Sequence, residues 1–155
     1  MSLADLLSAE ISRVSGRTFC AASSRDADGG CIHRALVLEG GGERWFVKLN
    51  AADALPMFEV ERDGLVALAD TNAFRVPRPL CCGVLDGQAF LVLEYLDLRP
   101  LALREEAVAC GRALAALHRH TGTRYGWRRD NFIGATPQIN TEHDNWPRFF
   151  AAARL

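Results

Sequence analysis

Lys48 lies near the end of the strand-like run 43–49 and is the residue whose neighbours best support a chemical role. A glycine turn at Gly29 and Gly30 precedes it, and Glu61 follows it on a segment with helical periodicity. A lysine ammonium held by a carboxylate can bind the phosphates of a nucleotide. This spacing therefore predicts a phosphate-binding site around Lys48.

Glu61 is the carboxylate that we expect to pair with Lys48. It shares a helical face with Leu65 and Leu68, at i, i+4 and i+7. A carboxylate buried on such a face is costly unless a cation reaches it. The periodicity leaves open a slightly rotated helix in which Glu61 lies at the solvent edge. Glu59 is the rival acid, but it groups with polar residues, where an exposed ion pair is its expected role.

Two further segments could contact a nucleotide. The backbone N–H groups of Gly29 and Gly30 could surround phosphates, although a Gly-Gly pair is also a common hairpin turn. The apolar run that ends at Glu94 could expose backbone groups to an adenine edge, or it could simply be the end of a strand. The predicted nucleotide-binding residues are Gly29, Gly30, Cys31, Lys48, Glu61, Glu94, Tyr95 and Leu96.

Cysteine and histidine side chains give weaker signals. Cys31 directly follows the glycine turn, where exposure and nearby N–H groups could make its thiol reactive. His118 and His120 lie near a predicted helix end, which favours a capping role over metal binding. No Cys-x-x-Cys spacing occurs, so no metal site is predicted in this chain. The remaining cysteines are expected to be inert core residues: Cys20, Cys81, Cys82 and Cys110.

The predicted elements alternate between period-2 and helical patterns. A capping box at Ser2 and Asp5 begins a helix that ends at Gly16, and an Asp86-Gly87 turn indicates a hairpin. Strands are predicted over 18–22, 31–38, 44–49, 80–85 and 89–95, and helices over 57–69 and 103–120, with a short final helix through Trp146, Phe149 and Phe150.

The order glycine turn, strand lysine, helix glutamate and strand exit is that of the small lobe of a kinase. We therefore expect an α+β fold with an antiparallel five-stranded sheet and a packed helix. The first helices of a large lobe would follow it. The predicted domains are a small lobe over residues 1–96 and a linker with the start of the large lobe over 97–155.

Composition limits the partners. The formal net charge of -1 and pI near 6.4 give no reason to expect a nucleic acid. The N-terminus lacks the basic region of a signal peptide, and no apolar run approaches membrane-spanning length. Five cysteines without a pairing pattern suit a reducing compartment. We expect a cytoplasmic chain with no membrane partner.

The chain resembles the fructosamine and ketosamine 3-kinase family, relatives of the aminoglycoside phosphotransferases. The similar stretches cover nearly the whole sequence and are specific as a set. They are residues 29–32, 46–50, 57–68, 76–79, 91–96, 114–118 and 130–140. The last stretch, with Trp146, Phe149, Phe150 and Arg154, separates this family from other kinase-like folds.

The resemblance implies phosphorylation, by ATP with Mg²⁺, of a hydroxyl on the third carbon of ketoamines. Ketoamines form when glucose or ribose condenses with amines, and the phosphorylated adduct is unstable, so the activity serves deglycation. The substrate would be a small ketoamine or a glycated protein. By the same resemblance, Lys48 binds phosphates, Glu61 orients it, and residues 94–96 hold adenine. Cys31 matches a cysteine associated in the family with redox-controlled, disulfide-linked homodimers.

The sequence departs from the family where catalysis takes place. Family members continue through a His-Gly-Asp loop that holds the general base and a later Asp that holds Mg²⁺. No His-Gly-Asp occurs in these 155 residues, and no Asp follows Asn145. Asp130 belongs to the motif that continues as Asn-Phe-Ile-Gly and is not a substitute. We expect a truncated protein or gene fragment that is inactive alone.

Two alternative functions remain open. One is a non-catalytic nucleotide-binding or dimerisation module. The other is a kinase of another small molecule, such as an aminoglycoside or choline, although the stretch 136–138 argues against it. In either case, we expect the incomplete large lobe to expose Trp146, Phe149 and Phe150.

Overall fold

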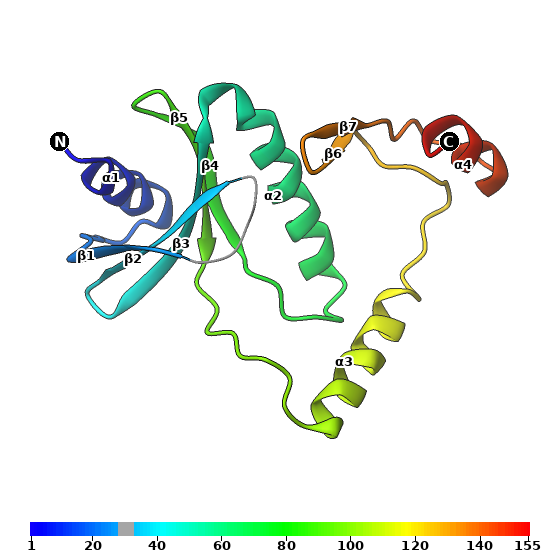
Figure 1. Ribbon diagram of the computed structural model, residues 1–155, viewed down its shortest axis with the longest axis horizontal. Coiled ribbons are helices and arrows are strands. Elements are labelled where there is room, and N and C mark those ends of the chain that lie inside the picture. The colour runs from blue at the N-terminus through cyan, green and yellow to red at the C-terminus, as the bar shows by residue number, and fades with distance from the viewer. Residues whose placement is uncertain (28–32) are drawn as a thin grey trace. The chain divides into compact units, whose positions relative to one another are not determined.

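A five-stranded antiparallel sheet organises the unit Met1–Pro100 of the computed structural model, which describes residues 1–27 and 33–155. The strand order is β1-β2-β3-β5-β4 (Figure 1). The strands are β1 (Ser23–Asp26), β2 (Arg34–Gly40), β3 (Glu43–Ala51), β4 (Pro79–Leu85) and β5 (Gln88–Glu94). The predicted α+β class and five-stranded antiparallel sheet are confirmed.

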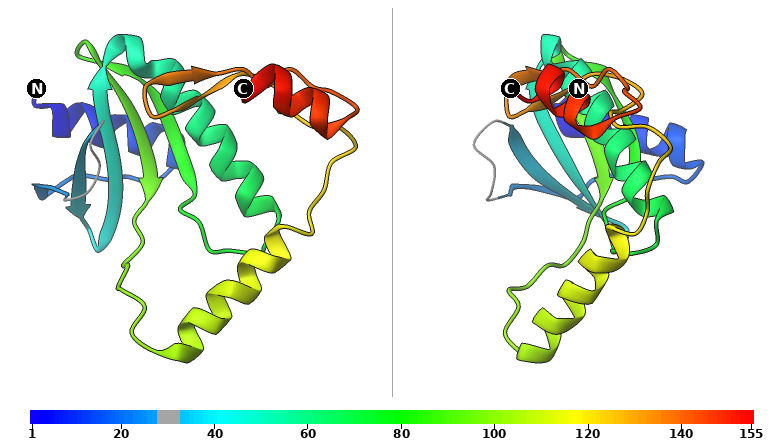
Figure 2. Two further views of the ribbon diagram at one scale, coloured as in Figure 1. Left: turned by 45° about the vertical axis from the view of Figure 1, so that its right-hand side comes forward. Right: turned by 90° about the vertical axis from the view of Figure 1, so that its right-hand side faces the viewer.

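One helix covers each face of this sheet. Helix α1 (Leu3–Ser15) packs its Leu7 and Ile11 side chains against one face. A short 3-10 turn, η1 (Ala52–Ala54), leads into α2 (Leu55–Asp70), which packs Phe58 against the other face. Figure 2 shows α2 running alongside β4 and β5 in both views. The central strands β3 and β5 are therefore covered on both sides.

Local sequence signals set the ends of several elements. The Ser2 hydroxyl accepts a hydrogen bond from Asp5 N, and the Asp5 carboxylate accepts one from Ser2 N, so the predicted capping box is confirmed. Asp86 and Gly87 both have positive φ, as a two-residue hairpin between β4 and β5 requires. The predicted hairpin at this turn is confirmed.

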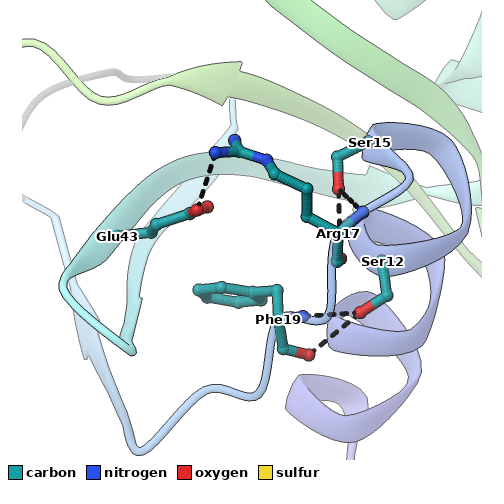
Figure 3. Close-up of polar contacts among 5 residues, drawn as sticks. All are labelled: Ser12, Ser15, Arg17, Phe19 and Glu43. Atoms are coloured by element: carbon teal, nitrogen blue, oxygen red, sulfur yellow. Dashed lines mark hydrogen bonds and ion pairs between the residues drawn. The ribbon is translucent and has the colours of Figure 1, made fainter.

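The predicted strand over residues 18–22 is wrong, because α1 takes up its backbone groups. The Ser12 hydroxyl accepts a hydrogen bond from Phe19 N at 2.9 Å and lies 3.0 Å from Phe19 O (Figure 3). Ala21 N donates to Ser8 Oγ at 3.1 Å. An added Cβ on Gly40 would meet Cys20 O at 1.9 Å, so β2 approaches this segment closely only because residue 40 is glycine.

The unit Leu101–Leu155 contains α3 (Arg104–Leu117), a hairpin of β6 (Asn131–Ile133) and β7 (Thr136–Gln138), and α4 (Trp146–Ala153). A polar network around the buried Asn140 joins the hairpin to the chain end. The backbone N–H of Asn140 donates to Asp130 Oδ1 at 2.7 Å, and its side-chain Nδ2 donates to Asn131 Oδ1 at 2.8 Å. Arg154 Nη2 donates to Asn140 Oδ1 at 2.6 Å.

Some predicted burial in this second unit is wrong. Trp146 and Phe150 are exposed as expected, but Phe149 is only 5% exposed, because the Arg154 guanidinium lies 4.6 Å from its ring centroid and Trp146 packs beside it. Helix α3 has no buried residue, and its apolar side chains Val108 and Leu114 are exposed. Among the described residues, no helix has the length and apolar character needed to cross a membrane.

The cysteines also divide differently from the prediction. Cys20 and Cys110 are exposed, so they are not core residues. Cys81 and Cys82 are partly buried on opposite faces of β4, each packed against a different core cluster. Burial raises the pKa of the Cys81 thiol to about 12 and also raises the pKa of Cys82. The inert character predicted for these two thiols is supported, because the thiolate is the reactive form.

Replacing Ser12 with alanine should lower the free energy of unfolding by about 1–2 kcal/mol, because Phe19 N and O lose their partner. Ser15→Ala is the matched control, since the Ser15 hydroxyl contacts Arg17 on the surface at 3.3 Å. Urea denaturation of both variants measures the difference. Equal stability of the two variants would contradict this account of the segment.

Candidate functional site

The side chains of β3 alternate between the two faces of the sheet. Val47 and Leu49 belong to the core under α1, whereas Phe46 packs with the cluster under α2. Because Lys48 is two residues from Phe46, it lies on the α2 face. Its register neighbours on either side are Ala35 and Leu91. Lys48 therefore projects from a nearly apolar part of the sheet.

Glu61 of α2 provides the carboxylate that this lysine needs. Lys48 Nζ lies 2.6 Å from Glu61 Oε1, and the two side chains are 26% and 29% exposed. The predicted ion pair is confirmed, in place of the alternative in which a slightly rotated helix leaves Glu61 at the solvent edge. A charge-assisted contact of this length fixes the ammonium at one position over the sheet.

A cavity of about 490 Å³ lies beside this ion pair. Its floor is a row of side chains on neighbouring strands, because Val37 is opposite Phe46 and Phe46 is opposite Leu93. The volume and the apolar floor suit a small-molecule ligand of nucleotide size. The lining residues are Arg25, Ala27, Val37, Phe46, Lys48, Glu61, Leu65, Pro77, Leu93, Glu94, Tyr95, Leu96 and Leu98.

The exit from β5 forms one end of the cavity. The strand ends at Glu94, one residue earlier than predicted. The Glu94 carboxylate accepts hydrogen bonds from Arg75 Nη2 and from Arg78 N. Glu94 N donates to Arg78 O at 2.8 Å. The carboxylate of Glu94 is thus engaged by the segment before β4. A ligand in the cavity would therefore contact the backbone of Glu94 rather than its carboxylate.

His33 lies near the ion pair on the same sheet face. Asn50 Nδ2 is 2.9 Å from His33 Nδ1, and the Phe58 ring centroid is 4.8 Å from that of His33. Burial, and next the positive charge of Lys48, lower the pKa of His33, while Glu61 opposes the shift. The lowered pKa favours the neutral imidazole at neutral pH, and its Nδ1 lies within hydrogen-bond distance of the Asn50 amide.

The structure gathers most of the predicted site residues around one cavity. Lys48, Glu61, Glu94, Tyr95 and Leu96 all line it. The predicted phosphate loop and the redox candidate, Gly29, Gly30 and Cys31, lie outside the described residues.

Sequence reasoning missed other residues of the cavity, including Arg25, Val37, Phe46 and Leu93. Alternation along β3 could have found Phe46, because it stands two positions before Lys48. Val37 and Leu93 require the strand register. The composition also singles out Lys48. It is the only lysine in the chain, and the rest of the 18 lysine and arginine residues are arginines.

Comparison with known proteins identifies similar sequences over this entire region. The fructosamine kinase family profile matches residues 3–155. A protein of Synechocystis sp. named "Probable ketoamine kinase" is 43% identical over 147 residues, covering 94% of this chain and 50% of that protein. The "Protein-ribulosamine 3-kinase, chloroplastic" of Oryza sativa subsp. japonica is 39% identical over 130 residues, covering 82% of this chain and 37% of that protein.

Solved structures agree with the sequence comparison. The crystal structure of a "Putative fructosamine-3-kinase" from Haemophilus somnus 129PT superposes with a TM-score of 0.84 at 26% identity, covering 94% of this chain and 49% of that chain. A second crystal structure, from Thermobifida fusca YX-ER1, gives a TM-score of 0.77 at 29% identity, covering 97% and 51%. This chain thus spans about half the length of the Synechocystis relative and of both proteins of known structure.

Acidification should destabilise the fold through His33. Its folded pKa is lowered, so the unfolded chain binds more protons, and stability falls as the pH drops below the unfolded value of about 6.5. Above that pH the contribution is fully present. The free energy of unfolding can be measured by urea denaturation from about pH 7.5 to about pH 5, a range that brackets the unfolded pKa. It should decline less steeply with falling pH for His33→Gln than for the wild type.

His120→Gln is the matched control, because His120 is exposed and lies outside this cluster. It should keep the wild-type dependence of stability on pH. An identical dependence in His33→Gln and the wild type would show that the neutral imidazole contributes nothing.

Proposed function

The chain belongs to the fructosamine kinase family, and we propose that it is the nucleotide-binding part of an ATP-dependent ketoamine kinase. The observation that carries this proposal is the 2.6 Å contact between Lys48 Nζ and Glu61 Oε1 beside a cavity of about 490 Å³. A lysine fixed by a helix carboxylate is the arrangement with which kinases hold nucleotide phosphates. The small-lobe boundary after Leu96 is part of the same proposal.

Each residue of the cavity has a proposed role. The Lys48 ammonium would bind phosphate oxygens, and Glu61 would keep it in position while the site is empty of ligand charge. The apolar row through Phe46 would contact the base, and backbone groups of residues 94–96 would hydrogen-bond its edge. Gly29, Gly30 and Cys31 are proposed to lie near the phosphates, and Cys31 is also proposed to link homodimers.

The proposed substrate is a ketoamine, either a small molecule or a glycated protein. Support comes from the names of the relatives, which are ketoamine kinases and protein-ribulosamine 3-kinases. The reaction would transfer the γ-phosphoryl group of ATP to a hydroxyl of the sugar-derived part. The hydroxyl proton would pass to a general base, and ADP would leave.

Magnesium would neutralise phosphate charge in this reaction, but we assign it no ligand in this chain. Across residues 1–27 and 33–155, no group of three or more histidine, cysteine, aspartate or glutamate side chains could hold a metal ion. Two carboxylates line the cavity, and both are engaged: Glu61 pairs with Lys48, and Glu94 accepts from Arg75 and from the backbone N–H of Arg78. The contribution proposed for this chain is therefore binding and orientation of the nucleotide.

Lys48→Ala should weaken binding of ATP on the order of tenfold or more, because the phosphates lose a charged partner. Binding of adenosine should be almost unchanged, since adenosine has no phosphate. Isothermal titration of the chain with ATP, ADP and adenosine measures the difference. Arg17→Ala is the control, because it removes a cation that pairs with Glu43 on the opposite sheet face. Equal ATP affinity in Lys48→Ala and the wild type would reject the proposed phosphate site.

The chain by itself should show no ketoamine-dependent formation of ADP from ATP and Mg²⁺. Without a positioned general base and metal-binding carboxylates, most of the electrostatic contribution to catalysis is missing. A coupled ADP assay with a fructosamine substrate measures this, and a longer relative of the family serves as positive control. Turnover above the rate with ATP alone would show that the chain contains a complete active site.

A further inference from the structure

Four polar side chains form a cluster where the chain leaves β5. The cluster consists of Arg25, Glu39, Arg44 and Tyr95. The Arg44 guanidinium carbon lies 4.3 Å from the Tyr95 ring centroid, and that of Arg25 lies 6.0 Å from it. Arg25 Nη2 donates to the Tyr95 hydroxyl at 3.4 Å, and Arg25 Nε is 3.5 Å from Glu39 Oε1. Two arginines therefore contact one tyrosine.

The cluster joins three strands to the segment after β5. Arg25 belongs to β1, and Glu39 and Arg44 are register partners on β2 and β3. Tyr95 follows Glu94, whose register partner on β3 is Trp45. Strand β1 has four residues, all exposed, and it pairs only with β2. Its position therefore depends strongly on side chains that reach beyond its one neighbour.

This cluster lies at the end of the cavity farthest along β3 from the lysine. Arg44 and Lys48 are four residues apart on the same face, a separation of about 13 Å at the usual rise of a strand. Arg25 and Tyr95 line the cavity, whereas Arg44 does not. Arg25 also stands opposite Val37, at the end of the apolar row. The cluster thus borders the part of the cavity proposed for the base.

We propose that Arg44 and Arg25 are positioning residues that clamp Tyr95 against β1 and β3, and so set the width of the base-binding end of the cavity. This inference rests on the proposed function, because it assigns the base to that end. Arg44 acts only through Tyr95, since it does not line the cavity itself. Its guanidinium fixes the ring from one side, and Arg25 ties the hydroxyl to β1.

Arg44→Met tests the clamp, because methionine keeps a flexible apolar side chain and removes the charge. It should lower the binding affinities for adenosine, ADP and ATP by the same factor, about three- to tenfold for the loss of a cation–π contact. Arg44→Lys keeps a cation and should stay within about twofold of the wild type. Tyr95→Leu should weaken binding at least as much as Arg44→Met, because it also removes the Arg25 contact and part of the cavity wall. Since Arg44 acts only through Tyr95, the double variant should bind no more weakly than Tyr95→Leu alone.

A second measurement needs no ligand. Hydrogen exchange at the amides of residues 23–27 should be faster in Arg44→Met and Tyr95→Leu than in the wild type, because β1 loses its link to the segment after β5. Arg17→Met is the control for both experiments. It removes an ion pair to Glu43, which precedes Arg44 on β3. It should leave both the exchange of residues 23–27 and the affinities unchanged.

The outcomes separate this inference from the proposed function. If the wild-type chain binds none of the three compounds, the proposed function is rejected, and hydrogen exchange alone decides whether the clamp exists. If the wild type binds them, three results would each overturn the inference. The first is that Arg44→Met binds adenosine with wild-type affinity. The second is that Arg44→Lys loses as much affinity as Arg44→Met. The third is that the losses of binding free energy in the two single variants add in the double variant.

Discussion

A lysine on a strand that is covered on both faces must have a carboxylate within reach. Val47 and Leu49 of β3 pack in the core under α1 on one face of the sheet. Lys48, which alternates with them, therefore points toward α2 on the other face. Glu61 meets it at 2.6 Å because Phe58, on the preceding turn of α2, is fully buried and fixes the helix against the sheet. The cavity beside the pair follows from this placement of the helix.

The two ends of the cavity differ in chemistry. The end at Lys48 is polar. His33 does not line the cavity, but its lowered pKa avoids adding a second cation near the lysine. The other end has an apolar floor through Phe46 and is bordered by Arg25 and Tyr95, with Arg44 packed on the Tyr95 ring outside the lining. Glu94 turns its carboxylate to Arg75 and Arg78, so the backbone at this exit is fixed by its own side chain. This polarity matches a ligand with a charged and an apolar half.

Much of the fold could be predicted, because its signals are local. The capping box at Ser2, the turn at Asp86 and the change of period in α2 each depend on residues close together in the sequence. The strand over 18–22 was predicted wrongly, since serine hydroxyls of α1 bond its backbone and no local pattern reveals that. The burial of Phe149 likewise depends on Arg154 reaching its ring.

Local sequence patterns were enough to predict the ion pair between Lys48 and Glu61. The sequence contains one lysine, a glutamate on an apolar helical stripe and family motifs along nearly its whole length. Tertiary structure decided which residues surround that lysine, because register and packing join positions that are distant in the chain. Val37, Phe46 and Leu93 share a row only through strand pairing. Arg25 and Arg44 meet at Tyr95 because three strands and the exit from β5 converge there.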